Sequence, residues 1–353
     1  MKEKRRQSRG RAGVGLVWFG AVCIFASGWI ESVRAQDPGL RFGGEIPAEV
    51  DTIYERGLAW LASAQAEDGN WEGSNGGPGV DGICLMAFLA GGEDANFGRY
   101  APNIRRAVRN IIGRQDEKTG YYGSSMYHHG FAMLALSEAY GVVDESLLHG
   151  DGKKGRSIAK SLELAIGCAV TAQEKNRWGA WRYSPDSTDA DTSVAGAVLM
   201  GLLAARNAGM KVPDEVMEAG LEYMRRSTGP NGHVAYSGGF GGMGESMNRS
   251  AIATLVYAVS KGKDTEEYEA TLEHITSRLE HRESGYKEYF RYYMAQALFQ
   301  GDYESWQKWN GALARQLADS QSDNGSFEDQ PYATGMSLLA LALNYRFLPI
   351  YER

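Results

Sequence analysis

The chain has 353 residues, of which 43% are hydrophobic and 23% charged, and its net charge at pH 7 is −7. This length and composition are typical of a globular protein with a sizeable buried core. The acidic balance argues against nucleic acid and anionic membranes as natural partners, because both attract basic surfaces. Three cysteines are too few for a disulfide framework in a chain of this length.

The first 35 residues have the features of a secretory signal peptide. Six Lys and Arg side chains fall within residues 2–11, an uncharged stretch covers 12–30, and Val33 and Ala35 precede a cleavage point. Removing residues 1–35 would take away seven basic and two acidic residues and leave a net charge of −12. We expect an exported protein without strong membrane binding after cleavage. The alternative is an uncleaved anchor, because the apolar stretch is nearly long enough to span a bilayer.

A glycine-containing motif recurs six times along the rest of the chain. Four copies begin with glutamine and read QAEDGNW, QDEKTGYYG, QEKNRWGAW and QSDNGSF, while STGPNGHVAY and RESGYKEYF are degraded copies. Self-similarity at a period of 40 to 59 residues is typical of a repeat architecture. The six motif glycines are Gly69, Gly120, Gly179, Gly232, Gly285 and Gly325.

Each copy lies between an amphipathic segment and an almost wholly apolar one. A helix with a charged stripe faces water on one side, whereas a helix that is apolar all round is buried on every side. The amphipathic segments therefore predict outer helices at 51–64, 102–114, 155–172, 213–227, 265–281 and 305–320. The apolar segments predict inner helices at 81–90, 127–140, 191–207, 246–260, 289–299 and 333–344.

Twelve such helices predict an all-α fold, an α/α toroid in which six outer and six inner helices form a closed ring. Residues 36–50 would be a linker, and 51–353 a single domain. An open solenoid is the alternative, although it would need atypical repeats at its ends. Within the motif, glycine supplies the positive φ that ends the outer helix, and the aromatic residue packs back against the next unit. Trp71 is therefore interpreted as a structural residue.

The motif Q-x-x-D-G-x-W/F, repeated at this spacing between helix pairs, resembles the repeat of squalene and terpene cyclases and of protein prenyltransferase β subunits. The resemblance covers the chain from Asp51 to Tyr345. It implies the α/α toroid and a substrate cavity inside the ring, at the mouth where the inner helices begin.

Polar and aromatic side chains cluster at the predicted starts of the inner helices. Apolar walls with a few convergent polar groups are typical of a small-molecule pocket. We expect Asp189, Asp191 and His128 to be catalytic, and Tyr127, Arg249 and Tyr292 to bind the ligand, with all six lining one cavity. The alternative for each acid is helix capping, because Asp is a preferred N-cap residue.

The family chemistries transfer only in part. Class II cyclases protonate an alkene with the middle acid of Asp-x-Asp-Asp-Thr, and aligning Asp191-Thr192 with the end of that stretch puts Ala190 at the donor position. Prenyltransferases hold zinc with Asp-x-Cys and a later His. Asp81, Cys84 and His128 are the nearest match, but their spacing is one residue too long. We therefore expect no metal and no other cofactor.

Three functional classes stay open. The first is an exported toroid that binds, and could transform, an isoprenoid-like apolar ligand in its central cavity, as the resemblance implies. The second is a carbohydrate-active enzyme, since α/α toroids also serve polysaccharide lyases and hydrolases. The third is a non-catalytic toroid that binds a ligand or a protein. The sequence does not decide whether the chain is an enzyme, and it predicts no oligomeric state.

Overall fold

The computed structural model describes residues 46–149, 155–238, 244, 246–283 and 285–351. The predicted signal peptide, 1–35, and residues 36–45 of the predicted linker lie outside the described residues, while residues 48–50 of that linker are already helical. Within these ranges, no helix is long and apolar enough to cross a membrane.

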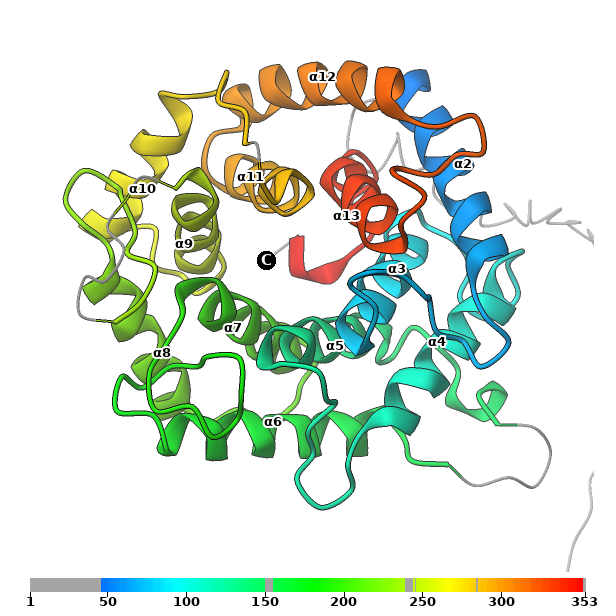
Figure 1. The fold of residues 1–353 in the computed structure, drawn as a ribbon, viewed down its shortest axis with the longest axis horizontal. Helices are drawn as coiled ribbons and strands as arrows, with labels where there is room; N and C mark the ends of the chain where they lie inside the picture. The colour runs from blue at the N-terminus through cyan, green and yellow to red at the C-terminus, as the bar shows by residue number, and fades with distance from the viewer. Residues whose placement is uncertain (1–45, 150–154, 239–243, 245, 284, 352–353) are drawn as a thin grey trace, which may run out of the picture. The chain divides into compact units, whose positions relative to one another are not determined.

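In the described residues, twelve α-helices alternate between an outer and an inner layer (Figure 1). The outer helices are α2 (Ala48–Ala64), α4 (Ala101–Arg114), α6 (Ile158–Glu174), α8 (Asp214–Ser227), α10 (Glu266–Thr276) and α12 (Tyr303–Ser320). The inner helices are α3 (Pro78–Ala90), α5 (Met126–Ala139), α7 (Thr192–Asn207), α9 (Met247–Val259), α11 (Lys287–Gly301) and α13 (Pro331–Leu341). A short 3-10 helix, η1 (Glu145–Leu147), lies between α5 and α6, and η2 (Ala342–Asn344) and η3 (Pro349–Tyr351) follow α13.

The helices close into a ring. Each inner helix contacts the next one, and α13 contacts α3, while the first outer helix α2 contacts both α12 and α13 (Figure 1). At this junction the Gln321 side chain donates to the carbonyl of Ile53 at 2.9 Å, and the Tyr345 hydroxyl donates to Asp51 at 3.0 Å. The prediction of a closed α/α toroid is confirmed, and the open solenoid is excluded.

The predicted helix boundaries hold within a few residues except after α10. This helix ends at Thr276 rather than at residue 281. The Ser277 hydroxyl and the Arg278 guanidinium both donate to the carbonyl of His274, at 3.1 and 3.3 Å. In a continuing helix this carbonyl would accept from a backbone N–H one turn later. Here the two side chains donate to it instead, and the helix ends.

In the four complete motif copies, one side-chain amide joins two successive outer helices. The glutamine amide donates to the carbonyl of its own motif glycine and to a carbonyl of the next outer helix, over distances of 2.8 to 3.1 Å. We call this pair of bonds the glutamine clasp. It is made by Gln65, Gln115, Gln173 and Gln321, which reach Asn103, Ser161, Val216 and Ile53 respectively.

Five of the six motif glycines have positive φ, and four of them touch the backbone of the next outer helix. A Cβ on Gly325 would lie 2.4 Å from the carbonyl oxygen of Arg56. A Cβ on Gly69, Gly120 or Gly232 would likewise lie 2.0 to 2.3 Å from a carbonyl oxygen of the next outer helix. Gly285 differs, since its φ is not positive and a Cβ there would meet no described atom within 4 Å.

The motif aromatic is structural, and where it is tryptophan its indole N–H bonds to the outer helix that precedes it. The Trp71 indole is buried and donates to the carbonyl of Leu61 at 2.8 Å, which lies on the outer helix that precedes it. Trp181 does the same toward Ala169 at 2.8 Å. The Trp181 ring also lies against the next unit, since a Cβ on Gly220 of α8 would be 3.2 Å from its Cζ3. The clasp glutamine and the motif glycine contact the backbone of the next outer helix.

A buried polar residue near the start of three inner helices accepts from the backbone N–H of the motif aromatic. Asp81 accepts from Trp71 at 3.0 Å, His129 Nδ1 from Tyr122 at 3.4 Å, and Thr334 from Phe327 at 2.9 Å. Such groups are costly to bury unless they are hydrogen-bonded. The polar side chains in these apolar helices therefore hold the motif loop in place.

We predict that Gly325→Ala lowers the free energy of unfolding by about 2–4 kcal/mol, because it adds strain at positive φ and a clash with the Arg56 carbonyl. Urea unfolding at pH 7 measures the loss. Gly285→Ala is the matched control and should change stability by less than about 0.5 kcal/mol, since the position is open. Equal losses in the two variants would contradict the role given to the glycine contact.

We also predict that Asp81 makes stability depend on pH. Burial raises the pKa of this carboxyl to about 6, although Trp71 N–H, Arg114 and Asn110 partly offset the rise. Between about pH 4 and pH 6, the Asp81 carboxyl is therefore protonated in the folded state and ionised in the unfolded state. The wild type should lose about 2–3 kcal/mol relative to Asp81→Asn as pH rises from about 4 to about 6. Parallel curves of unfolding free energy against pH for the two proteins would contradict this.

Candidate functional site

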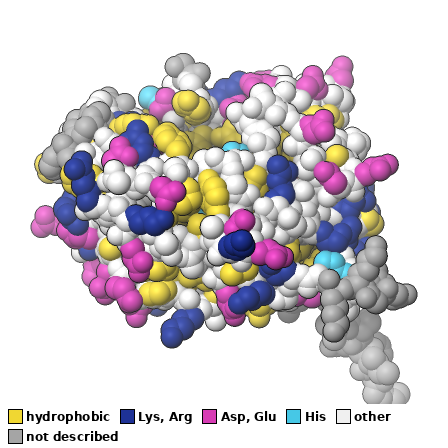
Figure 2. Space-filling model, turned by 60° about the horizontal axis from the view of Figure 1, so that its bottom comes forward, with side chains coloured by type: hydrophobic (Ala, Val, Ile, Leu, Met, Phe, Trp, Pro, Cys, Tyr) yellow, Lys and Arg dark blue, Asp and Glu magenta, His cyan; other side chains and the backbone are white. Residues whose placement is uncertain are grey.

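A cavity of about 430 Å³ opens at the end of the ring where the inner helices begin. This volume falls within the range of small-molecule pockets. On the face drawn in Figure 2, acidic and basic side chains are interspersed, while hydrophobic side chains gather in a hollow. The aliphatic part of the cavity wall comes from Val80, Ile83 and Val194.

Six tyrosines form the aromatic part of the wall, beside polar residues that include Asn75, Ser193, Ser246 and Asn248. Two of them, Tyr127 and Tyr289, face each other with ring centroids 5.6 Å apart. Burial raises the pKa of both hydroxyls well above its usual value, so they stay neutral at any physiological pH. The aromatic part of the wall is made by Tyr127, Tyr183, Tyr236, Tyr286, Tyr289 and Tyr332.

Asp191 is the one carboxylate among the described residues that line the cavity. It is the N-cap of α7, where its Oδ1 accepts from the backbone N–H groups of Ser193 at 2.8 Å and Val194 at 3.0 Å. Its Oδ2 accepts from the Tyr183 hydroxyl at 3.3 Å, which in turn lies 3.1 Å from the Tyr236 hydroxyl. Asp191 therefore both caps α7 and lines the cavity, because its two carboxylate oxygens have different partners.

His128 lies on the first turn of α5 and lines the cavity as a neutral imidazole. Its Nδ1 accepts from the backbone N–H of Gly79 at 3.2 Å, which leaves the proton on Nε2. Burial lowers the pKa of the ring, and the Arg114 charge adds to the effect. His128 can therefore donate a hydrogen bond from Nε2 without bringing a charge into the cavity.

Arg249 also lines the cavity, with part of its guanidinium already engaged. Its Nε donates to the carbonyl of Val234 at 2.7 Å, and a terminal nitrogen donates to the carbonyl of Gly244. Burial lowers the pKa of the Arg249 guanidinium, and the nearby Asp191 carboxylate offsets part of this by favouring the charged form. These bonds fix the direction of the guanidinium at the cavity wall.

Two residues expected in the cavity do not line it. Asp189 pairs with Arg182 at 2.6 Å and is half exposed, so its carboxylate is held on the outer side of the loop. Tyr292 is fully buried one turn deeper in α11, with its ring 5.8 Å from Phe131 and 4.8 Å from Tyr293. The expectation that six residues share the cavity is corrected to four: Tyr127, His128, Asp191 and Arg249.

Sequence reasoning missed three tyrosines of the wall. Tyr183 and Tyr236 come from motif loops, and each lies four residues after its motif glycine, Gly179 or Gly232. This shared repeat position was the available signal. Tyr286 precedes α11, has φ of 56°, and is 81% exposed at the cavity mouth. No periodic pattern marks it.

The residues considered for zinc have other partners. Asp81 accepts from Trp71 and Asn110, and the Cys84 thiol lies 3.7 Å from the Pro331 carbonyl in the apolar interior. Burial raises the pKa of the Cys84 thiol well above its usual value, which disfavours the thiolate that binds metals. Across the described ranges, no three His, Cys, Asp or Glu side chains are grouped to hold a metal ion.

No protein-family model and no curated protein matches the sequence. Solved structures do match the fold. A GH76A α-1,6-mannanase of Salegentibacter sp. HEL1_6 has TM-score 0.62 and 8% identity, over 84% of this chain and 98% of that one. A variant of the type II terpene cyclase MstE from Scytonema, in complex with geranylgeranyl dihydroxybenzoate, has TM-score 0.59 and 13% identity, over 85% and 99%.

A GH76 α-mannanase from Bacteroides thetaiotaomicron is similar as well, with TM-score 0.56 and 11% identity, over 88% of this chain and 99% of that one. At these identities the likeness concerns the fold alone, and one fold can host unrelated chemistries. The chain is an α/α toroid of the architecture that terpene cyclases and GH76 mannanases share.

Proposed function

We propose that the central cavity binds an isoprenoid-like, apolar small molecule, with Asp191 and His128 as the polar groups that orient it or act on it. The observation that carries this proposal is the composition of the wall. Tyrosine rings and aliphatic side chains make up the larger, apolar part of the wall, and among the described lining residues only Asp191 and Arg249 are charged groups. An apolar ligand would bury its surface against these rings and aliphatic groups, while the polar groups would orient one end of it.

Each polar residue has a separate proposed role. A carboxyl at Asp191, held by Tyr183, would act as general acid or stabilise a developing positive charge. The aromatic wall would support the same charge through its ring faces. His128 would orient a hydroxyl or carbonyl group through Nε2, and Arg249 would meet a diphosphate if the ligand carries one.

A carbohydrate ligand is the second candidate, and one observation favours it. Tyr286 is 81% and Tyr183 50% exposed, and both line the cavity mouth, where tyrosine rings could stack on sugars. Glycoside hydrolysis, however, normally needs two carboxyl groups on either side of the scissile bond. Asp189 cannot serve as the second, because it is paired with Arg182 outside the cavity.

The proposed localisation is outside the cytoplasm. It rests on residues 1–35, whose basic, apolar and small-residue regions follow the order of a secretory signal.

Direct binding tests the ligand class. Purified protein is titrated with geranylgeraniol and, in parallel, with α-1,6-mannotriose, and tyrosine fluorescence and calorimetry are recorded. We expect saturable binding of geranylgeraniol at one site per chain, weakened about tenfold or more in Tyr127→Ala through loss of aromatic contact. Binding of mannotriose alone would replace the isoprenoid proposal by the carbohydrate one.

We predict that Asp191→Asn separates capping from chemistry. Asparagine caps a helix about as well as aspartate, so the free energy of unfolding should change by less than about 0.5 kcal/mol. If Asp191 transfers a proton, turnover of a bound isoprenoid should fall by about 100-fold or more. Asp189→Asn is the matched control from the same loop and should leave turnover unchanged. Equal turnover in wild type and Asp191→Asn would reduce Asp191 to a cap.

A further inference from the structure

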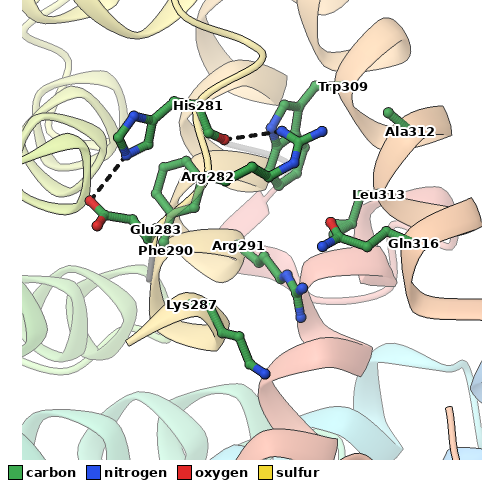
Figure 3. Close-up of a pocket in the computed structure, with 10 residues that line it drawn as sticks. All are labelled: His281, Arg282, Glu283, Lys287, Phe290, Arg291, Trp309, Ala312, Leu313 and Gln316. Atoms are coloured by element: carbon green, nitrogen blue, oxygen red, sulfur yellow. Dashed lines mark hydrogen bonds and ion pairs between the residues drawn. The ribbon is translucent and has the colours of Figure 1, made fainter. Parts of the chain in front are cut away.

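A second hollow, of about 240 Å³, lies outside the central cavity at the fifth motif copy. It is bounded by the loop before α11, the first turns of α11, and the α12 face that carries Trp309 and Gln316 (Figure 3). None of its lining residues belongs to the central cavity.

The hollow lies where the fifth copy lacks its clasp. This copy, RESGYKEYF, has no glutamine, and His281 stands four residues before Gly285, where a clasp glutamine would be. His281 turns instead to Glu283, with Nε2 at 3.4 Å from a carboxylate oxygen. Gly285 meets no described atom, whereas four other motif glycines touch the next outer helix. The interface with α12 is therefore open at this copy.

Three basic side chains line the hollow. Arg291 is only 9% exposed, yet its sole ionic partner in the described chain is Glu288, at the long distance of 4.0 Å. A guanidinium this buried normally makes close, charge-assisted hydrogen bonds. In Figure 3, Arg291 reaches into the hollow from α11, while Gln316 approaches from α12 on the other side.

The residues that line the hollow include three cations and one acid, and the carboxylates nearest to the cations lie outside the lining. Lys287 pairs with Glu328 and lies 3.6 Å from Glu288. Arg282 donates to the His281 carbonyl at 3.0 Å and has only a distant carboxylate, Glu280 at 3.9 Å. Glu283, the single acid of the lining, already faces His281.

The remaining wall is apolar. Phe290 and Trp309 stand edge to face with ring centroids 6.4 Å apart, and Leu313 completes this side. A ligand that matches both halves carries an anionic head for Arg291 and a flat or apolar body for the aromatic side. The volume suits a molecule of about one ring.

We propose that this hollow is a binding site for a small organic anion, whose carboxylate or phosphate group pairs with Arg291 and whose apolar body rests against Phe290 and Trp309. The ligand takes the place between the fifth copy and α12 that the clasp occupies elsewhere. This site is separate from the central cavity and independent of the function proposed for it.

The test uses benzoate as a probe on the purified full chain, followed by calorimetry and ligand-detected NMR. We expect one site per chain, with affinity that falls as salt is added. Benzyl alcohol, which keeps the ring but lacks the charge, should bind at least about tenfold more weakly, and Arg291→Met should weaken benzoate by a similar factor. Inorganic phosphate that displaces benzoate would support a phosphate head, and phosphate that does not would support a carboxylate.

Control variants locate the site. Ala312→Phe should fill the hollow and abolish benzoate binding while α12 stays folded, which provides a second test if Arg291→Met is unstable. Arg315→Met removes a cation from the exposed face of the same helix and should leave binding unchanged. Asp191→Asn should also bind benzoate normally, since it changes only the central cavity. Equal affinity for benzoate and benzyl alcohol, or unchanged binding in both Arg291→Met and Ala312→Phe, would overturn the proposal.

Discussion

The glutamine clasp is the interaction on which the ring depends. One primary amide has two N–H donors, and in four repeats these reach two carbonyls, one on the motif loop and one on the following outer helix. Together with the contacts of the motif glycines, the clasp sets in these four repeats how one outer helix is placed relative to the next. Because Gln321 reaches Ile53 of the first outer helix, the same bond that spaces the repeats also closes them.

Some polar residues at the starts of the inner helices serve the motif loops rather than the cavity. The motif loops must have their backbone N–H groups satisfied, and Asp81, His129 and Thr334 do this from inside apolar helices. An acid or a histidine at an inner-helix start is therefore not in itself a sign of chemistry. Asp191 is different, because only one of its oxygens is used by the helix and the other is held by Tyr183 at the cavity.

The sequence was sufficient for the fold because the fold is periodic. Six glycines and twelve alternating segments gave the ring, and the helix starts gave Tyr127, His128, Asp191 and Arg249 correctly as cavity residues. The two residues wrongly expected in the cavity were misplaced because a repeat pattern does not predict the direction in which a side chain points. Asp189 turns to Arg182 in its own loop, and Tyr292 lies one helical turn too deep.

The residues missed by the sequence reasoning have a shared physical origin. The inner-helix starts make only part of the cavity mouth, because the motif loops also reach it: Tyr183 and Tyr236 come from the third and fourth copies. These two hydroxyls form a hydrogen-bonded chain that ends on Asp191.

The same two loops thus build the aromatic wall and hold the carboxylate within it. A ligand that stacks on these tyrosines would contact the group that fixes Asp191, so binding and the orientation of the acid are coupled through one hydroxyl. Departures from the repeat therefore mark both candidate sites: tyrosines added after the motif glycine at the central cavity, and a glutamine lost before it at the outer hollow.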